Sequence, residues 1–138
     1  MMPSTLLVKI KNDINEMIRL REAVQKFAEQ IGLSQEVLFA LDLSLEELVT
    51  NVIFYGFDDD KEHSISVELQ LLENLLIMEI QDEGRPFDPT QKEDPRLDVP
   101  LEERQIGGLG IHLVRNYMDS MRYRRDGNRN ILTLEKRI

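Results

Sequence analysis

The spacing of apolar residues predicts three strands in the first two-thirds of the chain. Residues 4–10 (STLLVKI) form a short apolar run, and SISVELQLL at 64–72 alternates apolar with polar side chains. Alternation with a period of two is typical of a strand that buries one face. After a turn at Glu73-Asn74, the more apolar LLIMEIQD at 75–82 supplies a partner strand. The pattern therefore predicts a sheet with one covered face.

Helical spacing dominates the stretch between the first two of these strands. Apolar residues recur there in steps of three and four from Asp13, and Asp13 with Glu16 resembles a capping box. Gly32 is placed to end this helix, and Ser34 is placed to cap the next one. We expect the second helix to run from about 35 to 55.

The last part of the chain predicts a long loop, a third helix and a hairpin. Residues 83–107 hold four prolines among many charges, and a loop of that length is usually functional or disordered. A helix begins in GGLGIHLVRNYMDSM at 107–121, and 121–138 contains two strands joined near Asp126-Gly127-Asn128. We predict one α+β domain over 1–138, a two-layer sandwich in which about three helices cover one face of a mixed, mainly antiparallel sheet.

Composition narrows the class of protein. The 138 residues are 41% hydrophobic and 31% charged, with no run of eighteen apolar residues, which favours a cytoplasmic soluble domain over a membrane one. Cysteine is absent, and the two histidines, His63 and His112, lie far apart in the sequence. Neither a disulfide nor a zinc site built on thiolates or histidines is therefore expected.

The net charge of −9 argues against a general nucleic-acid binder, because neutralising phosphates requires a basic face. A local basic patch does exist in MRYRRDGNR at 121–129. It is either a solvated hairpin or a docking surface for an acidic protein partner. An acidic protein can still bind a nucleotide when backbone amides and a metal ion neutralise the phosphates.

Two polar residues interrupt the second helix away from its main apolar stripe. At about 100° per residue, Glu47 and Asn51 lie one turn apart among Ala40, Leu43 and Phe54. A helix that is apolar on both sides is normally buried, and a buried polar group without a partner costs on the order of a few kcal/mol. Either the pair reaches solvent at the domain edge, or it faces a bound ligand and its metal ion.

Glycines follow a strand at one position and open a helix at another. Asp82 ends an apolar strand two residues before Gly84, so its carboxylate can accept a hydrogen bond from an exocyclic amine while the glycine passes close to a flat ring. Gly107, Gly108 and Gly110 open a helix, where free amides bind anions. Taken alone, the Asp82–Gly84 motif is also typical of an ordinary turn, and the glycines at 107–110 are also typical of a flexible hinge. The glycines at 107–110 match neither a P-loop nor a dinucleotide-binding motif.

Together these motifs resemble the histidine-kinase-like ATPase superfamily, which includes gyrase, the heat-shock chaperone ATPases and sensor kinases. ExxxN on a helix, DxGxPF after a strand and GGLGI opening a helix occur here in the order and approximate spacing of that superfamily. Over nearly the whole chain the sequence is most similar to the short, free-standing branch of anti-sigma regulatory factors that act as serine kinases. The resemblance implies that ATP and Mg²⁺ bind.

The resemblance also implies roles for individual residues. Asn51 would coordinate the Mg²⁺ that bridges the ATP phosphates, and Glu47 would be the general base that orients a substrate serine. Asp82 would read the adenine amino group, and Gly84 would leave space for the ring. Residues 88–107 would form a mobile ATP lid. The other ATP-binding positions would cover the phosphates with backbone amides or stand beside the adenine-reading aspartate: Gly108, Leu109, Gly110 and Asn130.

Three positions depart from the pattern of the kinase branch. Tyr55 stands where histidine is common, and Ile106 stands where a basic residue is common, with Arg104 two positions earlier. Many relatives also place a threonine where Asn130 stands, and an amide could hold the same hydrogen bond to Asp82. The first two departures bear on phosphoryl transfer and leave nucleotide binding intact.

The resemblance implies an ATP-binding anti-sigma regulatory factor with serine-protein kinase activity. It would bind a sigma factor in one state and phosphorylate an anti-anti-sigma partner of the STAS type in another, with no direct nucleic-acid or membrane partner. A homodimer formed through the first strand and helix is a family expectation. The alternatives are a nucleotide-dependent protein-binding switch module without kinase turnover, and an α+β scaffold with accidental glycines.

Overall fold

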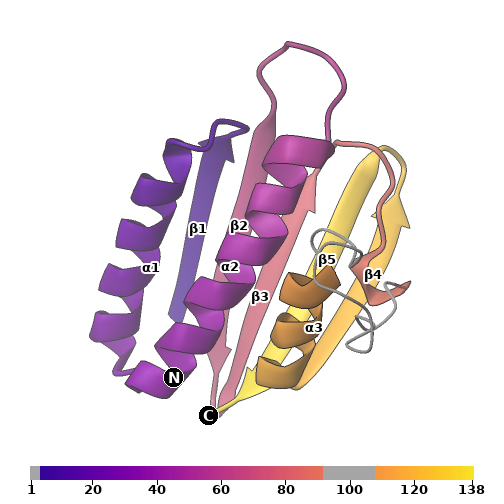
Figure 1. Cartoon of the computed structure of the whole chain (residues 1–138). Coiled ribbons are helices and arrows are strands. Elements are labelled where there is room, and N and C mark those ends of the chain that lie inside the picture. Colours follow the sequence, from indigo (N-terminus) through magenta and orange to yellow (C-terminus); the bar gives the residue numbers. More distant parts are fainter. Residues whose placement is uncertain (1–3, 92–107) are drawn as a thin grey trace.

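A five-stranded sheet with helices on one face forms the described part of the computed structural model, residues 4–91 and 108–138 (Figure 1). The sheet order is β1-β2-β3-β5-β4, and every pairing in it is antiparallel. The strands are β1 Ser4–Lys11, β2 Ser64–Leu72, β3 Leu75–Asp82, β4 Ser120–Asp126 and β5 Arg129–Arg137. The helices are α1 Glu16–Ile31, α2 Gln35–Tyr55, the 3-10 helix η1 Pro89–Gln91 and α3 Gly108–Tyr117.

These elements confirm the predicted α+β fold, with an antiparallel sheet where the sequence allowed a mixed one. Most of the predicted ATP lid at 88–107 lies outside the described residues, as do Arg104, Ile106 and Gly107. The extent of the domain over 1–138 therefore remains a prediction.

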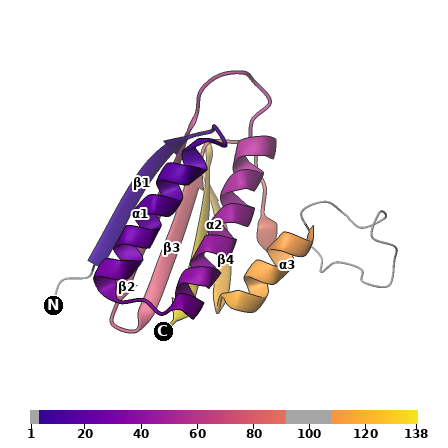
Figure 2. The ribbon, with the colours of Figure 1, turned by 60° about the vertical axis from the view of Figure 1, so that its left-hand side comes forward.

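The core lies between the sheet and its helical layer. Figure 2 shows α1, α2 and α3 on the same side of the sheet. The alternation in β2 is confirmed: Ile65, Val67 and Leu69 are buried, and the polar residues between them are partly exposed. Leu71, near the end of the strand, is half-buried. Burying these apolar side chains and the main stripe of α2 is the principal term that stabilises the fold. The stripe consists of Leu38, Leu41, Leu45, Leu48 and Val49, all buried, with Val52 half-buried.

Local chemistry sets the boundary between α1 and α2 as the sequence predicts. Gly32 ends α1 in the left-handed region at φ 72°, a conformation that glycine adopts without a steric penalty. Ser34 then caps α2, and its hydroxyl oxygen accepts a hydrogen bond from the Val37 amide at 3.2 Å. Both residues satisfy backbone groups that a helix end leaves without partners.

The cap of α2 gives a prediction for stability. Replacing Ser34 with alanine removes the acceptor for the Val37 amide, so we expect the free energy of unfolding to fall by about 1 kcal/mol. Urea denaturation followed by circular dichroism measures this change. Ser34→Asp, which restores a capping oxygen, should retain wild-type stability, and an alanine variant as stable as the wild type would contradict the capping role.

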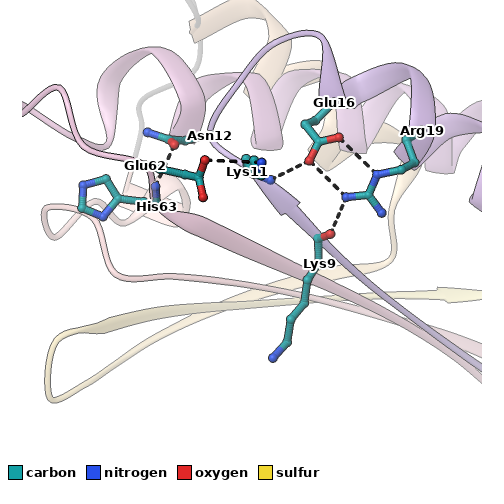
Figure 3. Close-up of polar contacts among 7 residues, drawn as sticks. All are labelled: Lys9, Lys11, Asn12, Glu16, Arg19, Glu62 and His63. Carbon is teal, nitrogen blue, oxygen red and sulfur yellow. Dashed lines mark hydrogen bonds and ion pairs between the residues drawn. The ribbon is translucent and has the colours of Figure 1, made fainter.

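The predicted capping box at the start of α1 is wrong. The helix begins at Glu16, and Asn15 in the cap position makes no side-chain cap bond. Asp13 closes a turn ahead of the helix, where its carboxylate accepts from the Asn15 amide at 2.9 Å. The Glu16 carboxylate accepts hydrogen bonds from the Arg19 guanidinium and from the Lys11 amide, the latter at 3.0 Å (Figure 3). Together these two donors lower the pKa of Glu16 to about 2. Short-range turn bonds therefore replaced the capping box.

The second face of α2 is less buried than its apolar residues predict. Ala40 is fully buried, but Phe54 is 58% exposed. The helix beside this face, α3, has 10 residues against the 21 of α2. Tyr117 of α3 lies edge-on to Phe39, with ring centroids 5.3 Å apart, and Gly110 lies against Glu47. These contacts place α3 against the stretch of α2 from Phe39 to Glu47, and Phe54 follows in the last turn of α2.

Candidate nucleotide site

A cavity of about 440 Å³ opens beside the C-terminal half of α2, a volume within the usual range for small-molecule sites. Its walls come from α2, β3, the loop after β3, α3, β4 and β5. Three of the predicted site residues, Asn51, Asp82 and Asn130, line it together. Much of the remaining wall is apolar and suits a flat ring: Leu48, Val52, Ile80, Phe87, Ile111 and Leu132.

Asp82 lines this cavity and has one carboxylate oxygen without a hydrogen-bond donor among the described residues. The side chain is 7% exposed, and its Oδ1 accepts from the Gly84 amide at 2.8 Å and from Asn130 Nδ2 at 2.9 Å. Oδ2 accepts no hydrogen bond from any residue in 4–91 or 108–138. Since no buried side-chain oxygen in those ranges lacks a partner, Oδ2 remains accessible. It is an acceptor available to a ligand that donates an N–H.

Gly84 allows the loop after β3 to approach the end of α2. A Cβ at this position would lie 2.6 Å from the Gly56 carbonyl oxygen and 2.9 Å from Asp82 Oδ1. The next residue, Arg85, donates its amide to that same carbonyl at 2.8 Å. The close approach that glycine permits is therefore to the α2 terminus, and Gly84 itself does not line the cavity.

Glu47 lies outside the cavity wall, against the start of α3. It is half-buried, and a Cβ on Gly110 would lie 1.9 Å from its Oε2. Gly108, Leu109 and Gly110 form the first turn of α3, where a helix has amides without helical partners and the positive end of its dipole. The carboxylate predicted as a base and the turn predicted to bind phosphate are thus adjacent.

Asn51 has an amide suited to a magnesium shell. It is half-buried on the cavity wall, and its side chain makes no hydrogen bond to any described residue. Within the described ranges no group of three or more His, Cys, Asp or Glu is placed to hold a metal. Mg²⁺ commonly takes one or two protein oxygens and fills its shell with phosphate oxygens and water, so this donor set fits a nucleotide-bound ion.

Sequence reasoning placed Asn130 next to Asp82 but missed the residues that hold it. The two are cross-strand partners in the β3–β5 register. Tyr123 and Arg125, from β4, donate to Asn130 Oδ1 at 2.5 Å and 3.1 Å. A period-two pattern in MRYRRDGNR would have placed Tyr123 and Arg125 on one face, apart from the arginines between and before them.

Comparison with known proteins identifies the chain. Residues 10–136 match the family described as histidine kinase-like ATPase domain. The serine/threonine-protein kinase BtrW of Bordetella bronchiseptica is 32% identical over 101 residues, which cover 73% of this chain and 71% of that protein. The serine-protein kinase RsbW of Listeria monocytogenes serovar 1/2a is 30% identical over 106 residues, 74% of this chain and 68% of that one. The anti-sigma F factor of Bacillus subtilis is 25% identical over 101 residues, 73% and 69% of the two chains.

A solved structure shows the same fold. The structure of the RsbU and RsbW domains of Rv1364c from Mycobacterium tuberculosis superposes with a TM-score of 0.67 at 14% identity. The match covers 97% of this chain and 32% of that one, so the chain spans about a third of that protein.

The fold, the cavity and the family match define a histidine kinase-like ATPase domain. Within that superfamily, the chain belongs to the branch of anti-sigma serine-protein kinases. Among the described helices, none combines the length and apolar character needed to cross a membrane.

Proposed function

We propose that this protein is an ATP-dependent serine-protein kinase that acts as an anti-sigma factor. The observation that carries the proposal is the arrangement along α2: one cavity is lined by Asp82, apolar side chains and Asn51, and Glu47 lies beside the first turn of α3. Relatives that align with about three quarters of the chain are named serine/threonine-protein kinase and serine-protein kinase.

The adenine end of the site is built from Asp82. Its Oδ2 accepts a hydrogen bond from the 6-amino group, while apolar side chains of the wall enclose the ring. A base with an oxygen at position 6 would instead set two acceptors against each other. This geometry supports ATP as the nucleotide.

The phosphate end of the site combines α3 with Asn51. Backbone amides of Gly108, Leu109 and Gly110 bind phosphate oxygens at the helix start. Asn51 supplies a side-chain oxygen to Mg²⁺. When bound, the ion neutralises part of the phosphate charge and holds the phosphates in a defined geometry.

Glu47 is proposed as the general base. It accepts the proton of a serine hydroxyl, directly or through a water, while the serine oxygen forms a bond to the γ-phosphorus and the bond from that phosphorus to ADP breaks. The carboxylate is half-buried and accepts no hydrogen bond from the described residues, so its oxygens are available for this role.

The proposed partners are proteins, in the cytoplasm. The chain binds a sigma factor in one state and phosphorylates a serine of an anti-anti-sigma protein of the STAS type in another. Homodimerisation is part of the proposal, and direct contact with nucleic acid or membrane is not. The net charge of −9 argues against direct contact with nucleic acid.

The test is phosphoryl transfer between purified proteins. Incubating the protein with Mg²⁺, radiolabelled ATP and its cognate anti-anti-sigma protein should move label to one serine of the partner. Tyr55, at the position where histidine is common and on the cavity wall, favours a second function, a nucleotide-dependent switch without turnover. ATP-dependent binding of the sigma factor with no transfer to any partner would establish the switch and refute the kinase.

A further inference from the structure

The segment Gly84-Arg85, in the loop that follows the proposed adenine-reading residue Asp82, is fixed by hydrogen bonds. Each of its four main-chain polar groups is hydrogen-bonded at 2.8 to 2.9 Å, so the loop keeps its shape without a ligand. The partners of Gly84 N, Gly84 O, Arg85 N and Arg85 O are, in that order, Asp82 Oδ1, Arg125 Nη1, Gly56 O and Asn130 Nδ2.

The Asn130 amide has no bonding capacity left for a nucleotide base. An amide nitrogen carries two N–H groups, and here they donate to Asp82 Oδ1 and to the Arg85 carbonyl, both at 2.9 Å. The amide oxygen accepts from Tyr123 and Arg125 on its other side. Asn130 is also 7% exposed, so water cannot readily replace these bonds.

The donors from β4 decide which way this amide points. An asparagine side chain can rotate to exchange its oxygen and nitrogen, and only its hydrogen-bond partners distinguish the two orientations. Tyr123 and Arg125 place donors at one end, so the N–H groups face Asp82. Asp82 Oδ1 is thereby occupied, and Oδ2 is left as the accessible acceptor of a residue that lines the cavity.

We infer that Tyr123 and Arg125 are positioning residues for recognition of a 6-aminopurine nucleotide. Their hydroxyl and guanidinium groups orient Asn130, and Asn130 fixes the rotamer of Asp82 and the loop at Gly84. The selectivity for an amino group at position 6 therefore depends on two side chains of a neighbouring strand. This inference rests on the proposed binding of ATP.

The test compares two nucleotides that differ only in the group that Asp82 reads. Dissociation constants of Mg²⁺-ATP and of purine riboside triphosphate, which lacks the 6-amino group, are measured for wild type and Tyr123→Phe. The variant keeps the ring and removes one hydrogen bond, so we expect ATP to bind roughly three- to tenfold more weakly. The analogue should lose less, and the preference for ATP should shrink.

Two further variants separate positioning from general damage. Arg125→Met removes the donor to Gly84 O and one donor to Asn130, and it should reduce the preference for ATP in the same direction. Tyr117→Phe is the matched control, because this tyrosine lies on α3 and its hydroxyl donates to no described residue. Its nucleotide preference should equal that of the wild type.

The outcomes distinguish failure of the positioning role from failure of the proposed ATP binding. An unchanged preference in Tyr123→Phe, or an equal loss for the two nucleotides, overturns the positioning role while ATP binding stands. Wild-type protein that binds neither nucleotide overturns the proposed function, and the inference with it.

Discussion

Asp82→Asn should abolish measurable ATP binding, with an affinity loss of about 100-fold or more. The neighbours of Asp82 decide how the new amide is oriented. Gly84 N and Asn130 Nδ2 both donate to the Oδ1 position, so the amide oxygen must stay there and the NH₂ group must take the place of Oδ2. A donor then faces the adenine amino group, which is itself a donor. Isothermal titration calorimetry with Mg²⁺-ATP measures the loss.

The same geometry predicts a change of preference in this variant. A donor in place of Oδ2 suits a base with oxygen at position 6, so inosine triphosphate should lose much less affinity than ATP does. Asp126→Asn, in the exposed β4–β5 hairpin, is the matched control and should bind ATP normally. An Asp82→Asn protein that binds ATP as the wild type does would show that adenine does not meet this carboxylate.

Glu47→Ala should stop phosphoryl transfer while ATP binding persists. A positioned general base contributes about 10²- to 10⁴-fold to such a reaction, so the transfer rate should fall by that factor. The ATP dissociation constant should stay near the wild-type value, because Glu47 does not line the cavity. Single-turnover transfer of label to the partner serine, together with equilibrium ATP binding, separates the two effects.

The neighbouring glutamate provides the control for this substitution. Glu46 pairs with Arg21 of α1 on another side of α2, so Glu46→Ala should transfer phosphate at the wild-type rate. Transfer by Glu47→Ala at an undiminished rate would exclude Glu47 as the base, and loss of ATP binding in the same variant would assign it a binding role instead.

Most of the fold could be predicted because helix ends and strand alternation depend on residues only a few positions apart. Gly32 and Ser34 determine adjacent helix ends by their own backbone preference and hydroxyl, and the structure places both as expected. The capping box failed for a related reason, because Asp13 has a second local use in a turn with Asn15 that competes with capping.

From the residues alone, the candidate site could be predicted only within short motifs, and the position of Asn130 beside Asp82 came from the resemblance to the family. Asp82 with Gly84, and Glu47 with Asn51, lie within short motifs, and their assigned roles remain predictions. Nothing within a few residues of Asn130 indicates that its amide spans β3, β5 and the loop at 84–85, because those contacts depend on sheet register.

The basic patch at 121–129 shows the same limit. Its arginines differ in surroundings: Arg122 and Arg124 are exposed and pair with Glu135 and Asp126, whereas Arg125 is half-buried and donates to the Gly84 carbonyl. Composition alone does not distinguish these arginines. The alternation of side chains along β4 places Arg125 on the opposite face of the strand from Arg122 and Arg124. Docking of an acidic partner on this hairpin stays a prediction.

The contact between Gly110 and Glu47 has a mechanical consequence. With an added methyl group only 1.9 Å from Oε2, α3 cannot move toward α2 at this point without turning the glutamate. Movement of α3 toward α2 and the orientation of the Glu47 carboxylate are therefore coupled. A protein that binds the C-terminal end of α3 and shifts this helix would stop the proposed phosphoryl transfer while the nucleotide stays bound.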